Sequence, residues 1–274
     1  IIYHLALKWD RTMIGYNHLG KNGRFGNQMF QYAALKGIAR KHGYDFCIPS
    51  GPKTEDGFYD EENQHKLLMA FKMPKVKLVD MFPAPYKKES GATFDEDLFE
   101  NCEDNVNLYG FFQTEKYFKH IEDEIRTDFT FVKDIMDPCT QAFGNEELIG
   151  LHIRRSDYVQ KQSYHPLCTL DYYERALKEL PGNLPVVIVS DDPEWCADQD
   201  LFESDRFMVS ESEDNIIDMC ILSLCSHHII ANSSFSWWGA WLAKSKKVIA
   251  PKVWYGPAAN IDESDIVPDD WERI

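Results

Sequence analysis

The alternation of apolar strand patterns with helical patterns across the second half of the chain constrains its fold more than any other feature. The pattern at residues 185–190 is continuously apolar, as expected when both faces of a sheet are covered. This alternation predicts an α/β fold with a parallel, doubly wound sheet. We expect strands at residues 148–153, 185–190, 228–231 and 247–250, and helices at residues 169–180, 214–225 and 234–243.

The first half begins with a similar pattern. Residues 13–17 resemble a short strand, residues 27–42 a helix with one apolar face, and residues 46–49 a second strand. A glycine-rich turn at residues 20–26 separates the first strand from the helix, which is the order of a Rossmann-like opening. A further strand is expected at residues 107–112.

Two stretches lack this regularity. Residues 50–105 are rich in Pro, Gly, Asp and Glu, and we expect loops and irregular elements there. Thr114 is expected to cap a helix. Residues 132–146 have the composition of a junction, so we expect two domains, residues 1–140 and residues 141–274.

The composition excludes several classes of partner. The 274 residues include 45 acidic and 29 basic side chains, and the formal net charge of −16 disfavours nucleic acid and anionic membranes. The chain contains no apolar run of 18 residues, so no integral membrane segment is expected. Its seven scattered cysteines form no C-x-x-C pair, which indicates free thiols and a cytoplasmic location.

Polar clusters follow three of the expected strands, where open α/β sheets bind their ligands. The first contains His152, Arg154, Arg155 and Asp157. A guanidinium at a strand end can bind a phosphate through two hydrogen bonds, although an Arg–Asp ion pair that closes the strand is an equal alternative. His152 and Arg154 share one strand face. Asp157 could orient one of the two arginines and leave the other free for a ligand.

The second cluster contains Asp191 and Asp192. Either carboxylate can accept hydrogen bonds from a ribose or a purine, or can cap the following helix, and the two roles can be divided between them. The third cluster contains hydroxyl residues at a helix start, where N–H groups and the helix dipole form an anion site or a capping turn. Its candidates are Asn232, Ser233, Ser234 and Phe235, and the tryptophans that follow are expected in the core.

The glycine-rich turn is a fourth candidate. It matches neither G-x-G-x-x-G nor G-x-x-x-x-G-K-[ST], which disfavours dehydrogenases and P-loop enzymes. Gly26 permits a close approach of the backbone to a ligand, and Arg24 and Asn27 add charge and hydrogen bonds at a helix start.

Taken together, the segments resemble the bacterial-type α-1,2-fucosyltransferases of glycosyltransferase family 11. The family patterns are G-x-x-G-N-Q-x-F-Q-Y-A, G-[YF]-[WF]-Q-[ST]-E-K-Y-F, H-x-R-R-x-D-Y, S-D-D and N-S-[ST]-F-S-W-W-G-A-W-L. They are matched in order by residues 23–33, 110–118, 152–158, 190–192 and 232–242. The third pattern and the last two are shared more loosely with α-1,6- and protein O-fucosyltransferases.

The resemblance implies a GT-B-like pair of Rossmann-type domains with parallel sheets and an interdomain cleft. It also implies inverting transfer of L-fucose from GDP-β-L-fucose to the 2-OH of a galactose-terminated glycan. Arg154 would bind the β-phosphate, so Arg155 is expected to pair with Asp157 and hold the loop. His152 with Asp191 or Asp192 would contact the guanosine. The turn around Asn232 would contact the diphosphate, with hydrogen-bond donors from Ser233, Ser234 and Phe235. Gly26, Asn27 and Arg24 would face the diphosphate from the first domain.

The resemblance further implies that no metal or other cofactor is needed, because an arginine replaces the divalent cation. Arg154, Arg155 and Asp157 are the expected catalytic group, and the candidates for a general base are Asp157, His165 and Asp171. Residues 50–105 match no family pattern and are expected on the acceptor side.

Three other functions remain open: a fucosyltransferase of α-1,6 or O-fucosyl type, a metal-dependent GT-A glycosyltransferase, and a non-catalytic sugar-nucleotide or glycan-binding module. The GT-A alternative would need a metal-binding D-x-D, for which residues 95–97 and 198–200 are matches that follow no apolar strand.

Overall fold

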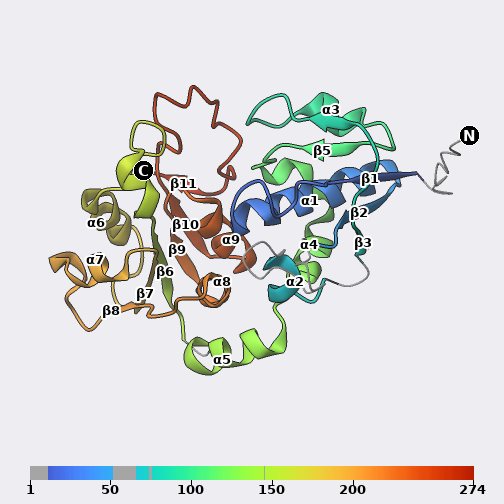
Figure 1. The fold of residues 1–274 in the computed structure, drawn as a ribbon. Helices are drawn as coiled ribbons and strands as arrows, with labels where there is room; N and C mark the ends of the chain where they lie inside the picture. The colour runs from blue at the N-terminus through green and yellow to red at the C-terminus, as the bar shows by residue number, and fades with distance from the viewer. Residues whose placement is uncertain (1–11, 52–65, 74–75, 145) are drawn as a thin grey trace, which may run out of the picture.

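The computed structural model describes residues 12–51, 66–73, 76–144 and 146–274, and it contains two parallel sheets that lie on either side of a helical layer (Figure 1). The first sheet has the order β3-β2-β1-β5-β4, and the second has the order β11-β10-β9-β6-β7-β8. Every strand pairing in both sheets is parallel, which confirms the predicted α/β class.

The strands of the first sheet are β1 (Met13–Gly15), β2 (Asp45–Pro49), β3 (Lys77–Val79), β4 (Tyr86–Lys88) and β5 (Asn107–Tyr109). Those of the second are β6 (Ile149–Ile153), β7 (Val186–Ser190), β8 (Phe207–Val209), β9 (His227–Ile229), β10 (Lys247–Ala250) and β11 (Glu272–Arg273).

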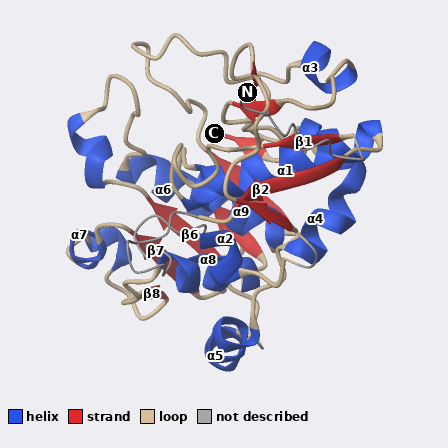
Figure 2. Cartoon of the chain, turned by 45° about the vertical axis from the view of Figure 1, so that its right-hand side comes forward, coloured by secondary structure: helices blue, strands red, loops and turns tan. Residues whose placement is uncertain are grey.

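Helices surround both sheets (Figure 2). The α-helices are α1 (Phe25–His42), α2 (Lys66–Ala70), α3 (Glu96–Glu100), α4 (Glu122–Asp128), α5 (Lys133–Phe143), α6 (Leu170–Lys178), α7 (Pro193–Ala197), α8 (Asn215–Leu224) and α9 (Ser234–Leu242). Short 3-10 helices are η1 (Glu115–Tyr117), η2 (Lys119–Ile121), η3 (Ser156–Gln160) and η4 (Asp200–Phe202).

The expectation of irregular structure at residues 50–105 is partly wrong. Within its described part, β3 and β4 form the two edges of the first sheet. Their residues are largely exposed and include lysines, as is common on edge strands, so the apolar alternation used to recognise strands is absent. Residues 52–65 and 74–75 of this stretch lie outside the described residues.

Two further segments differ from expectation. Thr114 caps a helix as predicted, but that helix is the short η1, and η2 and α4 follow it. The stretch expected as a junction contains α5, which has Pro138 inside it. Cys139 of α5 is buried in the main core and α5 packs on α8, so tertiary packing outweighs the helix-breaking tendency of proline.

Helices α1 and α9 lie between the two sheets and share one apolar core (Figure 1). The ring of Phe30 on α1 lies 4.5 Å from Trp237 and 5.0 Å from Trp238, centroid to centroid. The predicted burial of the tryptophans is confirmed, and Trp241 is buried beside them. The N-terminal ends of α1 and α9 are therefore held together at one place between the sheets.

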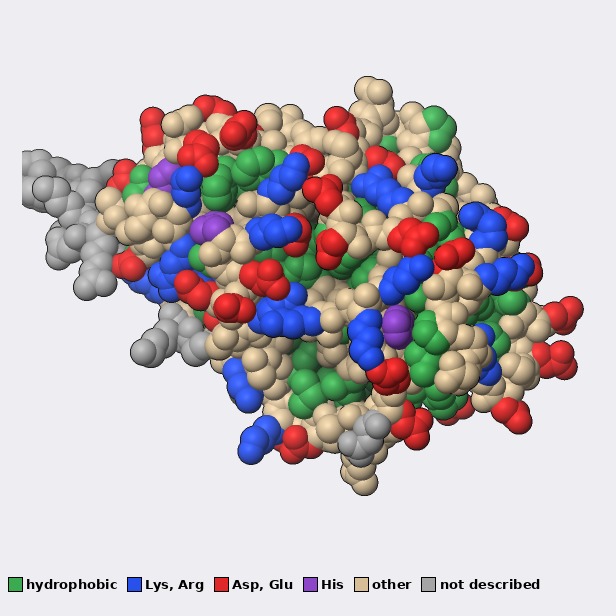
Figure 3. Space-filling view, turned by 180° about the vertical axis from the view of Figure 1, so that it is seen from behind, with side chains coloured by type: hydrophobic (Ala, Val, Ile, Leu, Met, Phe, Trp, Pro, Cys, Tyr) green, Lys and Arg blue, Asp and Glu red, His purple; other side chains and the backbone are tan. Residues whose placement is uncertain are grey.

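All seven cysteines are free thiols, six of them buried, as predicted. Among the residues that the structure describes, no helix has both the length and the apolar character needed to cross a bilayer. On the face drawn in Figure 3, acidic and basic side chains are interspersed rather than gathered by sign.

Candidate active site

A cavity of about 750 Å³ lies between the two halves of the chain. The first half contributes the start of α1 and the segments after β4 and β5, and the second contributes the segments after β6, β7 and β9 with the start of α8. All but two of the predicted site residues line it: Arg24, Gly26, Asn27, His152, Arg154, Asp157, Asp191, Asn232, Ser233, Ser234 and Phe235. The exceptions are Arg155 and Asp192, which are not among the residues that line the cavity.

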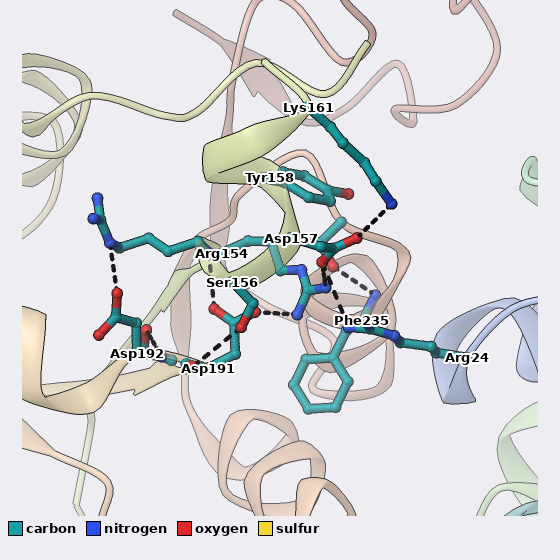
Figure 4. Close-up of polar contacts among 12 residues, drawn as sticks. Arg24, Arg154, Ser156, Asp157, Tyr158, Lys161, Asp191, Asp192 and Phe235 are labelled. Carbon is teal, nitrogen blue, oxygen red and sulfur yellow. Dashed lines mark hydrogen bonds and ion pairs between the residues drawn. The ribbon is translucent and has the colours of Figure 1, made fainter.

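Arg154 is held by two carboxylates. Its guanidinium donates from Nη2 to Asp157 and from Nη1 to Asp191, and only 14% of its side chain is exposed. A guanidinium has five N–H donors, so these two bonds leave others for a ligand. Asp157 is in turn approached by Arg24 at 3.7 Å and by Lys161 at 3.6 Å, as Figure 4 shows.

These contacts keep Asp157 ionised. Partial burial alone would raise its pKa, but the positive charges of Arg154, Arg24 and Lys161 together lower it. Arg24 is 72% exposed, so its guanidinium can move toward an anion in the cavity at little cost.

The predicted pair between Arg155 and Asp157 is wrong. Arg155 donates from Nε to Asp192 at 2.9 Å, and its guanidinium carbon lies 3.8 Å from the Trp195 ring centroid. The reason is the register of the second sheet, in which Ile153 of β6 lies opposite Ser190 of β7. The two residues after β6 therefore lie beside the two aspartates after β7.

The two aspartates have different roles, one of which was predicted. Asp192 caps α7 by accepting from the N–H of Trp195 at 3.3 Å. Asp191 lines the cavity, but its oxygens accept from the backbone N–H of Arg155 at 2.8 Å and from Arg154. Both carboxylates thus stabilise the loop after β6.

His152 is a buried, neutral imidazole on the cavity wall. Burial lowers its pKa to about 3, with Arg154 acting in the same direction and Asp191 against it. Its Nδ1 atom has no hydrogen-bond partner among the described residues. Its ring lies 5.3 Å from that of Phe235, centroid to centroid. Because a buried polar atom is costly without a partner, this nitrogen is suited to a ligand.

The start of α9 also lines the cavity. Ser233 is its N-cap and accepts from the N–H of Phe235 at 3.3 Å. Asn232 instead fixes the surrounding loops by donating to the carbonyls of Pro166 at 3.0 Å and Trp254 at 2.9 Å. A Cβ atom at Gly26 would lie 2.6 Å from the carbonyl carbon of Ser234, so only glycine allows the starts of α1 and α9 to approach so closely.

A carboxylate that the sequence analysis missed, Asp218, lines the same cavity from α8. It is 7% exposed, and burial raises its pKa to about 6 although the Ser210 hydroxyl donates to Oδ1 at 2.7 Å. The available signal was a single acidic residue within the otherwise apolar stretch of that helix.

The first half contributes two more polar groups that the sequence analysis gave no role. Gln113 donates to Asn27 at 2.6 Å and accepts from the Tyr255 hydroxyl at 2.8 Å, which links both halves at the cavity. Glu89 also lines the cavity, and burial raises its pKa to about 7 despite hydrogen bonds from the backbone and from Tyr117.

The structure separates the three candidates for a general base. Asp157 and His165 line the cavity, whereas Asp171 is exposed on α6 and pairs with Arg175 at 3.0 Å. The His165 ring stacks on Tyr158 with centroids 4.6 Å apart, and burial lowers its pKa.

Neither D-x-D match belongs to the cavity. Asp95 caps α3, and Asp97 accepts from the side chain of Asn101 at 2.9 Å. Asp198 and Asp200 flank the end of α7 and the start of η4. Within the described part of the chain, no group of three or more His, Cys, Asp or Glu side chains is arranged to hold a metal ion.

Solved structures share this fold at low sequence identity. NodZ α-1,6-fucosyltransferase co-crystallized with GDP has a TM-score of 0.55 and 16% identity, covering 87% of this chain and 94% of that one. POFUT1 in complex with GDP-fucose has a TM-score of 0.52 and 12% identity, covering 96% and 98%. The fold is therefore GT-B-like, as predicted.

Two relatives that are similar in sequence have names that specify transfer of a sugar in an α-1,2 linkage. The α-1,2-colitosyltransferase of Escherichia coli is 32% identical over 288 residues, covering 92% of this chain and 96% of that protein. Galactoside α-(1,2)-fucosyltransferase 1 of Homo sapiens is 25% identical over 247 residues, covering 81% and 64%. The profile of glycosyl transferase family 11 matches residues 1–274. The chain therefore belongs to glycosyltransferase family 11 and is a glycosyltransferase of the fucosyltransferase type.

Proposed function

We propose that this chain transfers L-fucose from GDP-β-L-fucose to the 2-OH of a terminal β-galactoside, without a metal ion. The cavity is the observation that carries the proposal: it combines a largely buried arginine, two helix starts and a buried carboxylate within about 750 Å³. That volume suits a nucleotide sugar together with the end of an acceptor.

The donor diphosphate would lie between Arg154 and the starts of α1 and α9. Helix N-termini attract anions through free N–H groups and the helix dipole. Asp157 and Asp191 hold the Arg154 guanidinium in place before the donor arrives, so little reorganisation is needed. Arg24 would close over the diphosphate from the first half.

Asp218 would recognise the guanine base of the donor. Asp191 and Asp192 are less suited, because their oxygens already accept hydrogen bonds within the protein. Guanine presents two adjacent donors, N1–H and the 2-amino group, which match one carboxylate. Uracil offers a single donor and adenine lacks this pair, so Asp218 favours GDP over other nucleotides. His152, neutral and lacking a partner at Nδ1, would bind a nucleoside hydroxyl.

In the transfer step, the acceptor oxygen forms a bond to C1 of fucose on the face opposite the diphosphate. The bond from C1 to the β-phosphate oxygen breaks, and its electron pair leaves with GDP. Arg154 stabilises the charge that grows on the diphosphate. The acceptor proton would pass to His165, because Asp157 is held ionised by three cations and is a weaker base.

A donor and acceptor assay tests this proposal. We expect fucose transfer from GDP-fucose to lactose, unaffected by EDTA, with an α-1,2 linkage in the product by NMR. Arg154→Ala should lower kcat about 10²–10³-fold at a temperature where the variant remains folded, as its thermal unfolding curve shows. A wild-type enzyme that neither transfers nor hydrolyses GDP-fucose, or an Arg154→Ala variant of near wild-type rate, would refute the proposal.

The relative named as a colitosyltransferase favours a second candidate donor, GDP-L-colitose. Colitose is L-fucose without the 3-hydroxyl group, so both donors fit the same diphosphate and guanine contacts. A larger kcat/KM for GDP-colitose than for GDP-fucose would replace the sugar in the proposal and leave the binding mode unchanged.

A further inference from the structure

The loop after β5 carries an exposed aromatic ring at the cavity. Phe111 is 44% exposed and lines the cavity, whereas the next residue, Phe112, is fully buried. The Phe112 ring packs edge-on against Tyr16 and Tyr117, with centroids 6.1 and 5.2 Å away. Both residues line the cavity, but the Phe112 ring packs in the core and only the Phe111 ring is exposed.

The backbone of this loop is strained. Phe112 has a φ of 53°, in the left-handed region that disfavours a residue with a Cβ atom. Such a conformation persists only where the surroundings impose it, and it is found preferentially at ligand sites.

Glu89 holds this conformation. Its Oε2 atom accepts from the backbone N–H groups of Phe111 at 2.9 Å and Phe112 at 3.0 Å, and the Tyr117 hydroxyl donates to Oε1 at 3.2 Å. A Cβ atom at Gly110 would lie 2.5 Å from Oε2, so a larger residue would displace the carboxylate.

A second clamp acts on the same loop. The Tyr16 hydroxyl donates to the carbonyl of Gly110 and accepts from its N–H at 3.1 Å. The loop is thus fixed before any ligand binds, and the Phe111 ring is an aromatic surface on a rigid support.

We propose that the Phe111 ring is the platform on which the apolar face of the acceptor's terminal galactose packs, and that Glu89 acts through Phe111 as a positioning residue. This inference rests on the proposed function, because it assigns the acceptor end of the same cavity. A β-galactoside presents a face of C–H groups, which suits the electron-rich face of an aromatic ring. Gly91 and Ala92, which follow Glu89, also line the cavity, and both are small and uncharged, as suits a neutral sugar.

Kinetics with GDP-fucose and lactose test the platform in the full chain. Phe111→Ala should raise KM for lactose roughly tenfold, whereas KM for GDP-fucose and acceptor-free hydrolysis of GDP-fucose should change less than about twofold. Phe111→Tyr, which keeps the ring, should behave like wild type. Tyr86→Ala is the matched control, because Tyr86 is 55% exposed on the neighbouring β4 and does not line the cavity.

An unchanged KM for lactose in Phe111→Ala would overturn the platform. So would a wild-type enzyme that hydrolyses GDP-fucose but whose rate responds to no β-galactoside, and this second outcome would leave the donor assignment standing.

A double-mutant cycle tests the role of Glu89. Glu89→Gln keeps the side-chain volume and should raise KM for lactose about three- to tenfold, with little change in KM for GDP-fucose. In the Phe111→Ala background, the same change should add less than about twofold, because its effect passes through the ring. Fully additive effects, or a rise in KM for the donor alone, would overturn the positioning role.

Discussion

Replacing Asp218 by Asn should weaken donor binding and, at the same time, stabilise the folded chain. Burial holds the pKa of Asp218 at about 6, above its usual range, so the folded protein binds this proton more tightly than the unfolded chain does. The resulting stability is fully present below the unfolded pKa and is lost as the pH rises through about 6. At pH 7 the charged carboxylate therefore costs up to about 3 kcal/mol, a cost that Asp218→Asn removes.

Donor binding should respond in the opposite direction. Two guanine donors need the ionised carboxylate, so the affinity for GDP-fucose should fall about tenfold for each pH unit below 6. GDP-fucose is the appropriate ligand, because its diphosphate has no ionisation near this pH, whereas the terminal phosphate of GDP does. Asp218→Asn should weaken binding at pH 7 by about 1.5–3 kcal/mol, roughly 10–100-fold, and should abolish the pH dependence.

Calorimetric titration with GDP-fucose between pH 5 and 8, together with thermal unfolding, measures both effects. Glu211→Gln is the matched control, because this exposed carboxylate lies near the start of the same helix and does not line the cavity. The assignment of Asp218 is refuted if wild-type affinity is constant from pH 5 to 7, or if Asp218→Asn binds GDP-fucose as tightly as wild type at pH 7.

Two further predictions concern residues around the cavity. Arg155→Ala should keep kcat within about fivefold of wild type while lowering the melting temperature, because Arg155 pairs with Asp192 and does not line the cavity. A fall in kcat as large as that of Arg154→Ala would contradict this. Gly26→Ala should destabilise the chain by about 2 kcal/mol or more and weaken GDP binding, because its Cβ atom would clash with Ser234. Gly182→Ala is the control, because a Cβ atom there would have no neighbour within 4 Å. Equal unfolding curves for the two variants would exclude the clash.

Most of the candidate site could be predicted from the sequence because it lies at strand ends. The carboxyl ends of parallel strands converge at one edge of a sheet, so the polar residues after 148–153, 185–190 and 228–231 were expected to meet. The structure brings His152, Arg154 and Asp191 of these segments to the same cavity.

The ion pairs were harder to predict because they depend on register. Spacing along the chain suggested a pair between Arg155 and Asp157, but the alignment of β6 with β7 gives Arg155 a closer partner in Asp192. Asp218 was missed for a related reason: it reaches the cavity from the side of a helix, where no strand end marks it. Glu89 follows an exposed edge strand that has no apolar pattern at all.

The same geometry supports the proposed binding of a dianionic diphosphate to a chain with a net charge of −16. Arg154, Arg24 and Lys161 gather around the carboxylate of Asp157, and Arg154 also pairs with Asp191, so three positive charges lie beside two negative ones in a chain whose net charge is negative. An arginine buried without partners would be costly, and its two carboxylates remove that cost in the free protein. They do not fill its five donors, so the diphosphate need only complete the hydrogen bonding of Arg154 and need not break an ion pair. In the proposed binding mode, the ion pairs that also close the end of the strand therefore hold Arg154 ready for an anion in an acidic protein.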